Sequence, residues 1–323
     1  MTLRKMDCHA LTDPGSFRDE NDDQFLIADL VKAVRVQMTS LDHDSQTELT
    51  GQSHGKIFMV ADGIGDSEAG RRASLLAIDE MIDCMVNRME WFALRKRHAD
   101  GKDHKSLADD LIDAMMHCQQ RIRDEATWNS TREGMGTTLT VAIIDWPQLH
   151  VVHVGGNRCY VCRGERIEQL TRDHTLARAL QEKQVLADEE LEDSIARDAV
   201  WNVVGGRSDD LRPEVCHAQL SIGDALLLCT DGLTSQVDDN EIAAVLRRKA
   251  NAKHTCEQLV AEANGRGGAD NVTVALARFH DADDVPLEDH ALVDSETLLA
   301  DRQPSGQITE ALSTDVSAPE AGL

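Results

Sequence analysis

The sequence predicts an α+β domain built from short antiparallel strands and a few longer helices. Short apolar or β-branched segments alternate with longer stretches of helical periodicity, as in layered α+β folds. Two polar breaks between strand segments, residues 145–148 and 163–165, have the composition of hairpin turns. Strands that are joined by such turns run antiparallel, so the sheets are expected to be antiparallel.

Seven segments are predicted to be strands, because each is short, rich in β-branched or apolar residues and bounded by polar or glycine-containing breaks. They are residues 24–31, 56–61, 139–145, 149–154, 159–163, 225–230 and 272–279. The polar, Ser- and Thr-rich residues 39–55 are expected to form an exposed hairpin. Cys159 and Cys162 form a CxxC motif within one strand, where their side chains point to opposite faces. This favours reduced core thiols over a zinc site.

Three segments are predicted to be helices from the spacing of their apolar residues. Residues 69–97 and 106–127 each carry an apolar stripe, and residues 100–103 form a polar joint between the two. A third helical segment, residues 177–192, ends in an acidic run that is expected to face solvent.

Composition bounds both the organisation of the chain and its functions. Among 323 residues, 58 Asp and Glu face 33 Lys and Arg, which gives a net charge of −25. Such a charge argues against binding to nucleic acid or to an anionic membrane. No segment approaches the roughly 18 apolar residues of a membrane helix, no signal peptide is evident, and the eight cysteines are too sparse for a disulfide scaffold. A cytoplasmic location is therefore expected.

The acid is unevenly distributed along the chain. Residues 281–323 hold eleven Asp and Glu against one Arg and have no aromatic residue, so they cannot bury enough apolar surface to fold alone. We therefore expect a catalytic domain over residues 1–280 and an acidic, disordered tail over residues 281–323.

Two aspartates stand directly after apolar strand segments, where a surface position is a poor explanation. Asp62 follows residues 57–61 and precedes Gly63, and Asp231 follows residues 225–230 and precedes another glycine. An aspartate at a strand end can point into a cleft, while the glycine permits a positive φ or a close approach of backbone. Either dipeptide taken alone is more often an ordinary turn.

Further acidic residues precede two other strands. Asp270 lies just before residues 272–279, and Asp22 and Asp23 directly precede the first predicted strand. Clustered carboxylates repel one another and are costly to bury unless a cation neutralises them. Mg²⁺ and Mn²⁺ take oxygen ligands, and two such ions can activate water and hold a phosphoryl group. Arg18, four residues before Asp22, carries the planar guanidinium that suits a phosphate.

Seven short motifs follow one another in an order that resembles the protein phosphatase 2C family. They are Arg18 with Asn21-Asp22-Asp23, Val60-Ala-Asp-Gly-Ile-Gly65, Gly136-Thr-Thr138, Val154-Gly-Gly-Asn-Arg158, Leu170-Thr-Arg-Asp-His174, Thr230-Asp-Gly-Leu233 and Asp270-Asn-Val-Thr273. The resemblance covers about residues 10–280. It implies a four-layer α-β-β-α sandwich of two antiparallel sheets flanked by helices. It also implies metal-dependent hydrolysis of phosphoserine and phosphothreonine on proteins.

The resemblance further implies the residues that carry out this reaction. Two Mn²⁺ or Mg²⁺ ions would be held by Asp22, Asp23, Asp62, Gly63, Asp231 and Asp270. Asp62 would bridge the two ions, and Gly63 would contribute its carbonyl oxygen. Arg18 would hold the substrate phosphate, with Asp22 and Asp23 as the other catalytic residues beside the metal-bound water. The implied chemistry is in-line attack by a metal-bridging hydroxide without a phosphoenzyme.

The chain departs from the family pattern at three positions. Asp22 stands where the family usually has Glu, and Ile64 stands where some members have a histidine described as a general acid. Gly156 replaces the aspartate of a third metal site, so that site is expected to be weak or missing. This departure keeps an alternative open, namely a catalytically weak or inactive phosphatase-like domain that binds phosphoproteins. The expected partners are phosphorylated protein substrates and an opposing serine/threonine kinase, and the expected state is a monomer.

Overall fold

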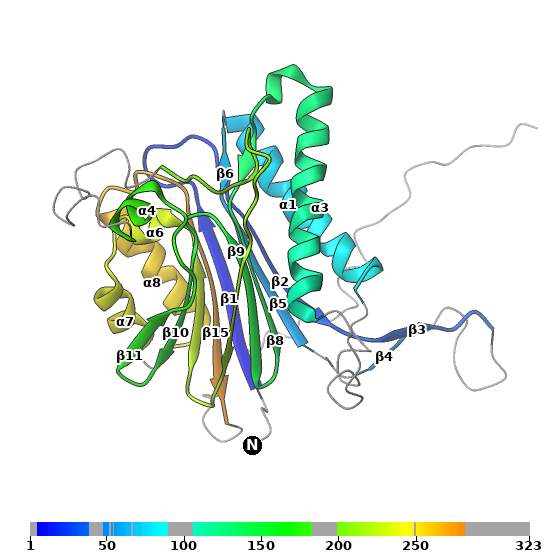
Figure 1. Ribbon diagram of the computed structural model, residues 1–323. Coiled ribbons are helices and arrows are strands. Elements are labelled where there is room, and N and C mark those ends of the chain that lie inside the picture. The colour runs from blue at the N-terminus through cyan, green and yellow to red at the C-terminus, as the bar shows by residue number, and fades with distance from the viewer. Residues whose placement is uncertain are drawn as a thin grey trace, which may run out of the picture. The chain divides into compact units, whose positions relative to one another are not determined.

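Two five-stranded antiparallel sheets lie face to face between two layers of helices (Figure 1). The computed structural model describes residues 5–281 except residues 39–47, 52, 54, 66, 90–105, 183–198 and 249. The α+β sandwich implied by the sequence motifs is confirmed. The acidic tail lies outside the described residues apart from its first position, Asp281, so the boundary at residue 280 stays a prediction. None of the described helices is long and apolar enough to cross a membrane.

The first sheet has the strand order β13-β9-β8-β5-β2. Its strands are β2 (Gln24–Leu30), β5 (Gly55–Ala61), β8 (Leu139–Asp145), β9 (Gln148–Val154) and β13 (Glu214–Gln219). β8 and β9 pair from their shared turn outward, with Asp145 opposite Gln148, as the polar break predicted. Four of these five strands were predicted from the sequence.

The second sheet has the order β1-β15-β14-β10-β11. Its strands are β1 (Lys5–Asp13), β10 (Arg158–Arg163), β11 (Arg166–Gln169), β14 (Ala225–Cys229) and β15 (Val272–His280). On β10, Cys159 is buried in the core between the sheets and Cys162 in the core under the helices. All the cysteines are free, so the expectation of opposite-facing core thiols is confirmed.

Helices cover the outer face of each sheet. α1 (Ser67–Asn87) and α3 (Leu107–Trp128) pack on the first sheet, and the short helix η1 (Ser130–Arg132) follows α3. α6 (Asp231–Thr234), α7 (Asp239–Leu246) and α8 (Ala252–Gly265) pack on the second sheet, and α4 (Leu176–Glu182) follows β11. Reciprocal side-chain caps set the starts of α3 and α7, since Ser106 pairs with Asp109 and Asp238 with Glu241.

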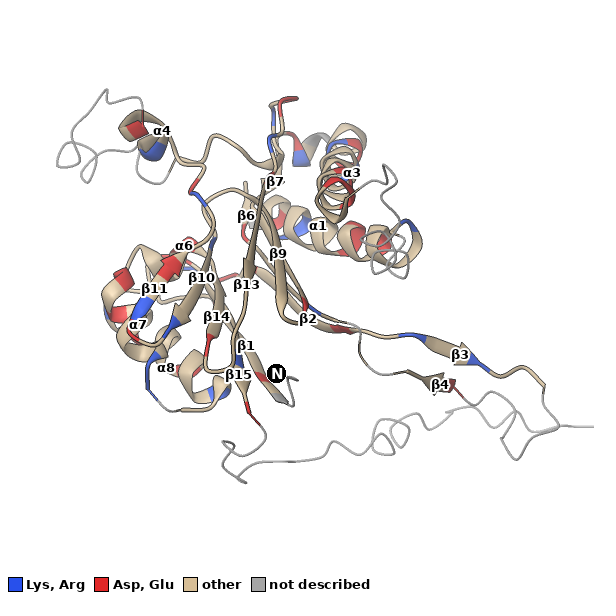
Figure 2. Ribbon diagram, turned by 60° about the horizontal axis from the view of Figure 1, so that its bottom comes forward, with Lys and Arg blue, Asp and Glu red and all other residues tan. Residues whose placement is uncertain are grey.

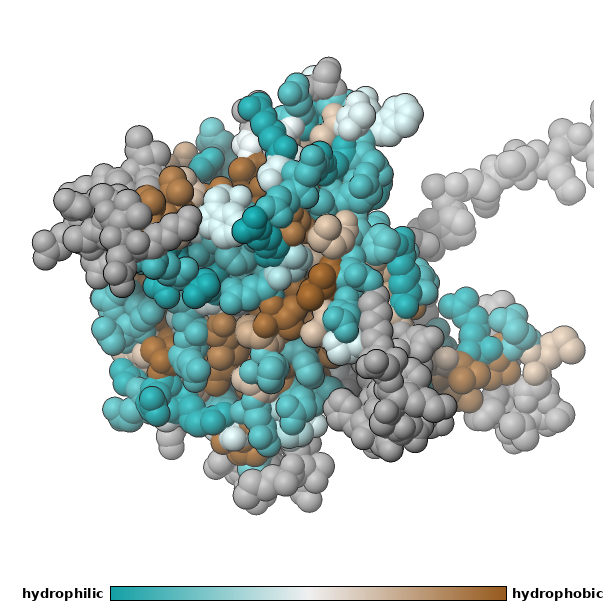
Figure 3. Space-filling model, in the orientation of Figure 1, coloured by the Kyte–Doolittle hydropathy of each residue, from teal (hydrophilic) through white to brown (hydrophobic). Residues whose placement is uncertain are grey.

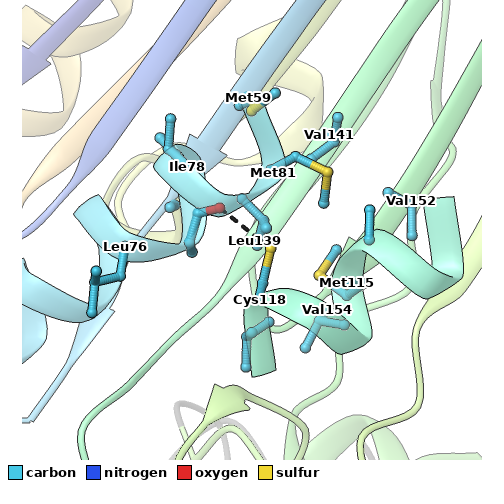
Figure 4. Close-up of a cluster of buried hydrophobic side chains, with 14 of the residues drawn as sticks. Met59, Leu76, Ile78, Met81, Met115, Cys118, Leu139, Val141, Val152 and Val154 are labelled. Carbon is cyan, nitrogen blue, oxygen red and sulfur yellow. Dashed lines mark hydrogen bonds between the residues drawn. The ribbon is translucent and has the colours of Figure 1, made fainter. Parts of the chain in front are cut away.

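Three apolar cores correspond to the three interfaces between layers. Under α1 and α3, Met81 and Met115 fill the space above the first sheet, and Cys118 donates to the main-chain oxygen of Ala77 (Figure 4). Met81, Met85 and Met115 are therefore core residues, because an unbranched thioether adapts to the irregular space between helices and sheet, whereas Met116 of α3 is exposed.

Two small sheets complete the fold. β6 (Gly63–Ile64), β7 (Gly136–Thr137) and β12 (Val204–Gly205) form a short three-stranded sheet at one end of the sandwich. β3 (Ala33–Arg35) and β4 (Glu48–Thr50) form a hairpin that extends away from the body in both ribbon views (Figure 1, Figure 2). The apolar side chains of Val34 and Leu49 in this hairpin are exposed. Figure 3 shows hydrophobic atoms on the part of the chain that extends to the right of the body.

The differences between expectation and structure have local causes. β1, β11 and β13 were not predicted, because each mixes charged or His residues with few apolar ones and is only half-buried. The exposed hairpin predicted at residues 39–55 begins earlier, at Ala33, and its middle lies outside the described residues. The joint at residues 100–103 and the acidic run after residue 187 are also outside the described part.

Candidate active site

The two sheets deliver one aspartate each to the same end of the sandwich. Asp62 follows β5 of the first sheet, and Asp231 opens α6 directly after β14 of the second sheet. Both line a cavity of about 390 Å³. Figure 1 labels β6 and α6, which carry Gly63 and Asp231 of its lining. The cavity is lined by Arg18, Asp22, Asp62, Gly63, Ile64, Gly65, Ala199, Val200, Asp231, Asp270 and Asn271. Six of the seven predicted site residues line it, and Asp23 lies beneath.

The glycines that follow Asp62 and Asp231 are required by close backbone contacts. A Cβ on Gly63 would lie 2.4 Å from the main chain of Gly70 in α1. A Cβ on Gly232 would lie 1.9 Å from the carbonyl oxygen of Asn271. Of the two reasons that the sequence offered for these glycines, close approach is the right one, since neither has a positive φ.

The main chain of Asp22 is held by hydrogen bonds to the residue that precedes β15 and to helix α1. Its N–H donates to Asn271 Oδ1 at 2.8 Å, and its carbonyl oxygen accepts from Ser74 Oγ of α1 at 2.6 Å. Asn271 in turn donates to the carbonyl oxygens of Pro14 and Glu20. The amide of Asn271 therefore fixes the loop that carries Arg18 and the acidic pair.

Asp23 is fully buried and held by two threonines. Its Oδ2 accepts from Thr273 Oγ1 at 2.7 Å and from Thr230 Oγ1 at 2.9 Å. Asp62 is held through its main chain, since its N–H donates to Thr138 Oγ1 and its carbonyl accepts from the Thr138 N–H, both at 2.9 Å. These threonines were part of the sequence motifs but received no role there. Only the folded structure shows that they orient the acidic residues.

Three carboxyl groups at this site, those of Asp22, Asp23 and Asp62, hold their protons more tightly than ordinary aspartates because their pKa values are raised. Burial, followed by the charge of Glu20, raises the pKa of Asp22. Burial raises the pKa of Asp23 to about 7, against the two threonine hydrogen bonds. Burial and then the charge of Asp231 raise the pKa of Asp62 well above its usual range. The repulsion among these carboxylates is the electrostatic signature of a site that receives cations.

The donor set fits divalent metal ions that prefer oxygen. Oδ1 of Asp22 and Oδ1 of Asp23 are buried without a hydrogen-bond partner, which is costly unless a ligand takes up the lone pairs. Among the described residues, no three acidic, His or Cys side chains converge as the ligands of one fully coordinated ion would. The carboxylates lie around the cavity instead, as in sites where water and substrate complete the coordination.

Arg18 lies beside the carboxylates at the mouth of the cavity. Its Nη2 atom is 3.1 Å from the carboxylate of Asp270, and both side chains are about half exposed. The residues before it are pinned to the loop that precedes β15, because Ser16 N–H donates to the carbonyl of Gly268 at 2.8 Å. The structure thus places an accessible guanidinium next to the acidic cluster, as the sequence predicted.

Known proteins share both this sequence and this fold. A protein phosphatase of Streptococcus pneumoniae named PhpP is 33% identical over 235 residues, which are 70% of this chain and 87% of that protein. The sequence model of the family described as protein phosphatase 2C matches residues 39–272. This chain belongs to the protein phosphatase 2C family.

Solved protein phosphatase 2C structures match most of the chain. The crystal structure of the Mycobacterium tuberculosis serine/threonine phosphatase PstP has a TM-score of 0.66 at 25% identity and covers 85% of this chain and 99% of its own. The phosphatase Stp1 of Staphylococcus aureus has a TM-score of 0.66 at 26% identity, with 87% and 98% covered. The PstP catalytic domain with two manganese ions has a TM-score of 0.64 at 25% identity, with 85% and 99% covered.

Proposed function

We propose that this chain is a metal-dependent phosphatase that hydrolyses phosphoserine and phosphothreonine on proteins. The observation that carries this proposal is the cavity that joins Asp62 and Asp231, from different sheets, to the guanidinium of Arg18. The solved PstP catalytic domain, which holds two manganese ions, supports a dinuclear Mn²⁺ or Mg²⁺ centre in this cavity. The relatives of this chain are named phosphatases, which favours an enzyme over a phosphatase-like binding domain.

The residues of the cavity divide the work between binding metal and binding phosphate. The carboxylates that would hold the ions are those of Asp22, Asp23, Asp62, Asp231 and Asp270, together with the carbonyl oxygen of Gly63. When bound, two divalent ions supply an activated water and positive charge at the phosphoryl group. Arg18 would bind two oxygens of the phosphate through its planar guanidinium, exchanging its contact with Asp270 for the substrate.

Hydrolysis of p-nitrophenyl phosphate and of phosphoserine and phosphothreonine peptides, measured with and without Mn²⁺, tests the proposal. We expect turnover that requires Mn²⁺ and that is lost in Asp231→Asn. Arg18→Ala is expected to raise KM more than it lowers kcat, since it removes a phosphate contact and no metal ligand. A wild-type protein that binds Mn²⁺ and phosphopeptides without hydrolysing them would establish the binding domain instead.

We also propose that a third metal site is weak because Gly156 offers no carboxylate. A Cβ at this position would lie 3.6 Å from Asp231 Oδ2 and 3.7 Å from Val200 Cγ2, so a longer side chain would point at the metal centre without a backbone clash. We expect Gly156→Asp to add one Mn²⁺ per chain in calorimetric titrations and to raise kcat at high Mn²⁺. Equal stoichiometry and equal activity would rule this out.

The remaining expectations are proposals about context. A phosphoprotein phosphatase needs an enzyme that installs its substrate, so a serine/threonine kinase opposes it. We propose a cytoplasmic monomer whose catalytic domain ends near residue 280. Size-exclusion chromatography with light scattering, and the activity of a chain truncated after residue 280, test the last two points.

A further inference from the structure

His174 is a buried histidine next to the cavity but outside its lining. It lies in the loop between β11 and α4, with only 6% of its surface exposed. Its ring centroid is 4.9 Å from that of His153 and 5.4 Å from that of Trp201. Neither histidine lines the cavity.

The polar atoms of His174 hold one residue, Gly155, from both sides. The main-chain N–H of His174 donates to the carbonyl of Gly155 at 2.8 Å, and Nδ1 accepts from the N–H of Gly155 at 3.1 Å. The Nδ2 atom of Asn202 lies 2.9 Å from the same Nδ1. Because a peptide N–H can only donate, Nδ1 carries no proton. The proton of the neutral ring is then on Nε2, which lies 3.5 Å from Glu214 Oε2.

The environment of the ring favours this neutral form. Burial lowers the pKa of His174, and the charge of Glu214 opposes that effect. Protonation at Nδ1 would set a ring N–H against the N–H of Gly155 and the amide of Asn202, so the cation would lose two hydrogen bonds. His174 is therefore a fixed acceptor in the folded chain.

Gly155 connects His174 to the predicted bridging ligand. Its φ is +116°, and a Cβ would lie 2.5 Å from the side chain of Thr138, so the turn packs tightly behind that threonine. Thr138 holds Asp62 through two hydrogen bonds of 2.9 Å, one in each direction. A shift of the Gly155 turn would thus be passed to the main chain of Asp62 through direct contacts.

The segment that begins at His174 also supports one wall of the cavity. The carbonyl oxygen of His174 accepts from the N–H of Trp201 at 3.0 Å, and Thr175 pairs with Val200 in an isolated antiparallel bridge. The N–H of Leu176 donates to the carbonyl of Ala199 at 2.8 Å. Ala199 and Val200 both line the cavity. His174 therefore contacts both the Gly155 turn behind Thr138 and the segment that forms this wall of the cavity.

We propose that His174 is a positioning residue of the phosphatase site, whose neutral imidazole holds Asp62 and the Val200 wall in place through Gly155. This proposal rests on the proposed function for its effect on turnover. Its effect on metal binding stands on the contacts of the chain itself. Supporting residues of metal ligands typically change metal affinity or activity by about 10- to 100-fold when they are replaced.

Two polar substitutions distinguish the effect of the hydrogen-bond acceptor at Nδ1 from the effect of losing the imidazole ring. His174→Asn places its amide oxygen near the position of Nδ1, whereas His174→Gln places its amide near Nε2 and leaves the Gly155 N–H without an acceptor. We expect His174→Gln to weaken Mn²⁺ binding by about 10-fold in calorimetry of the apo protein and to lower kcat, with a smaller change in KM. His174→Asn is expected to restore most of both losses.

A matched control distinguishes positioning from loss of stability. Leu259→Ala removes a buried side chain of α8 from the core between the second sheet and its helices, and Leu259 does not line the cavity. If Leu259→Ala lowers the melting temperature as much as His174→Gln and leaves Mn²⁺ affinity unchanged, the effect of His174→Gln is local. Equal Mn²⁺ affinity in His174→Gln and wild type, or no recovery in His174→Asn, would overturn the proposal. Absent turnover in the wild type would instead contradict the proposed function, because Mn²⁺ affinity is measured separately.

Discussion

Two groups of acidic side chains, one at the candidate active site and one around Arg158, differ in whether the chain provides a cation for them. At the candidate active site, Asp22, Asp23 and Asp62 all have raised pKa values and two of their oxygens lack a partner. In the second group, Asp173 forms a bidentate ion pair with Arg158 at 2.7 to 3.0 Å.

The second group is satisfied by protein atoms alone. Arg158 also donates to Asp239 Oδ1 at 3.3 Å and to the hydroxyl of Tyr160 at 3.0 Å, while that hydroxyl donates to Asp239 at 2.8 Å. The carboxylates that pair with Arg158 connect β10, the loop before α4 and the start of α7. A carboxylate that has no guanidinium partner remains available to bind a ligand. The contrast separates structural acids from functional acids.

We call Asp22, Asp23 and Asp62 the uncompensated group, and Asp173 and Asp239 around Arg158 the compensated group. The largest expected effect comes from a substitution in the uncompensated group. Asp62→Asn removes the predicted bridging ligand, and we expect Mn²⁺-dependent hydrolysis to fall by at least about 100-fold, since even supporting residues cost up to that much. The metal-free protein should melt at a higher temperature, because a repelling buried charge is gone.

Asp239→Asn is the control for this change, since it alters an acid of the compensated group. It should keep Mn²⁺-dependent activity. Equal losses of activity in the two variants would contradict the distinction between the groups.

Breaking the compensated group should affect stability more than metal binding. Arg158→Met leaves Asp173 without its partner, and we expect the free energy of unfolding to fall by about 2–4 kcal/mol. Both side chains keep some exposure, which moderates the loss. Urea denaturation measures the change, and calorimetry should show Mn²⁺ affinity near that of the wild type. A loss of Mn²⁺ affinity as large as that of Asp62→Asn would show that the two groups act as one.

The pH dependence of the metal-free protein should report the uncompensated group. Because burial raises the pKa of Asp23 from its ordinary value of 3.8 to about 7 in the folded chain, its contribution to stability is complete below about pH 4 and is lost as the pH rises through 7. Because Asp23 binds a single proton, it changes the free energy of unfolding by at most about 1.4 kcal/mol per pH unit.

Asp23→Asn isolates this contribution, because the buried histidines act in the opposite direction. Burial lowers the pKa of His153 to about 3, so the fold loses stability from that group as the pH falls below about 6.5. Urea denaturation with chelator at pH 5, 6 and 7 should therefore show a difference between wild type and Asp23→Asn that changes with pH. A difference that stays constant would show that Asp23 does not titrate in this range.

The smallest effect is expected for a single hydroxyl in the compensated group. Tyr160→Phe removes the hydrogen bond to Asp239 and the contact with Arg158, and should cost about 1 kcal/mol of unfolding free energy. Kinetics with Mn²⁺ should not change. A loss above that of Arg158→Met would mean that Tyr160, and not Arg158, organises this group.

Much of the fold could be predicted because the relevant signals are local. Strands such as β5 and β14 are continuous apolar segments, and α3 carries its stripe and its cap in consecutive turns. β1 was missed because its stability comes from pairing with β15, more than 250 residues away, and its own residues are only half-buried. Edge strands of this kind carry little of their own signal, since the partner provides the order.

The sequence by itself determined the family, the acidic motifs and six of the residues that line the cavity, because these depend on residue type and order. The tertiary structure decided which acids share a site and which atoms support them. Asp62 and Asp231 meet only because two sheets stack, and the threonines that hold Asp23 and Asp62 lie within or directly beside other strands. The physical reason is that burial and hydrogen bonding act between residues that are distant in the chain. In the folded chain, burial raises the pKa values of Asp23 and Asp62, whereas Asp173 is paired with Arg158.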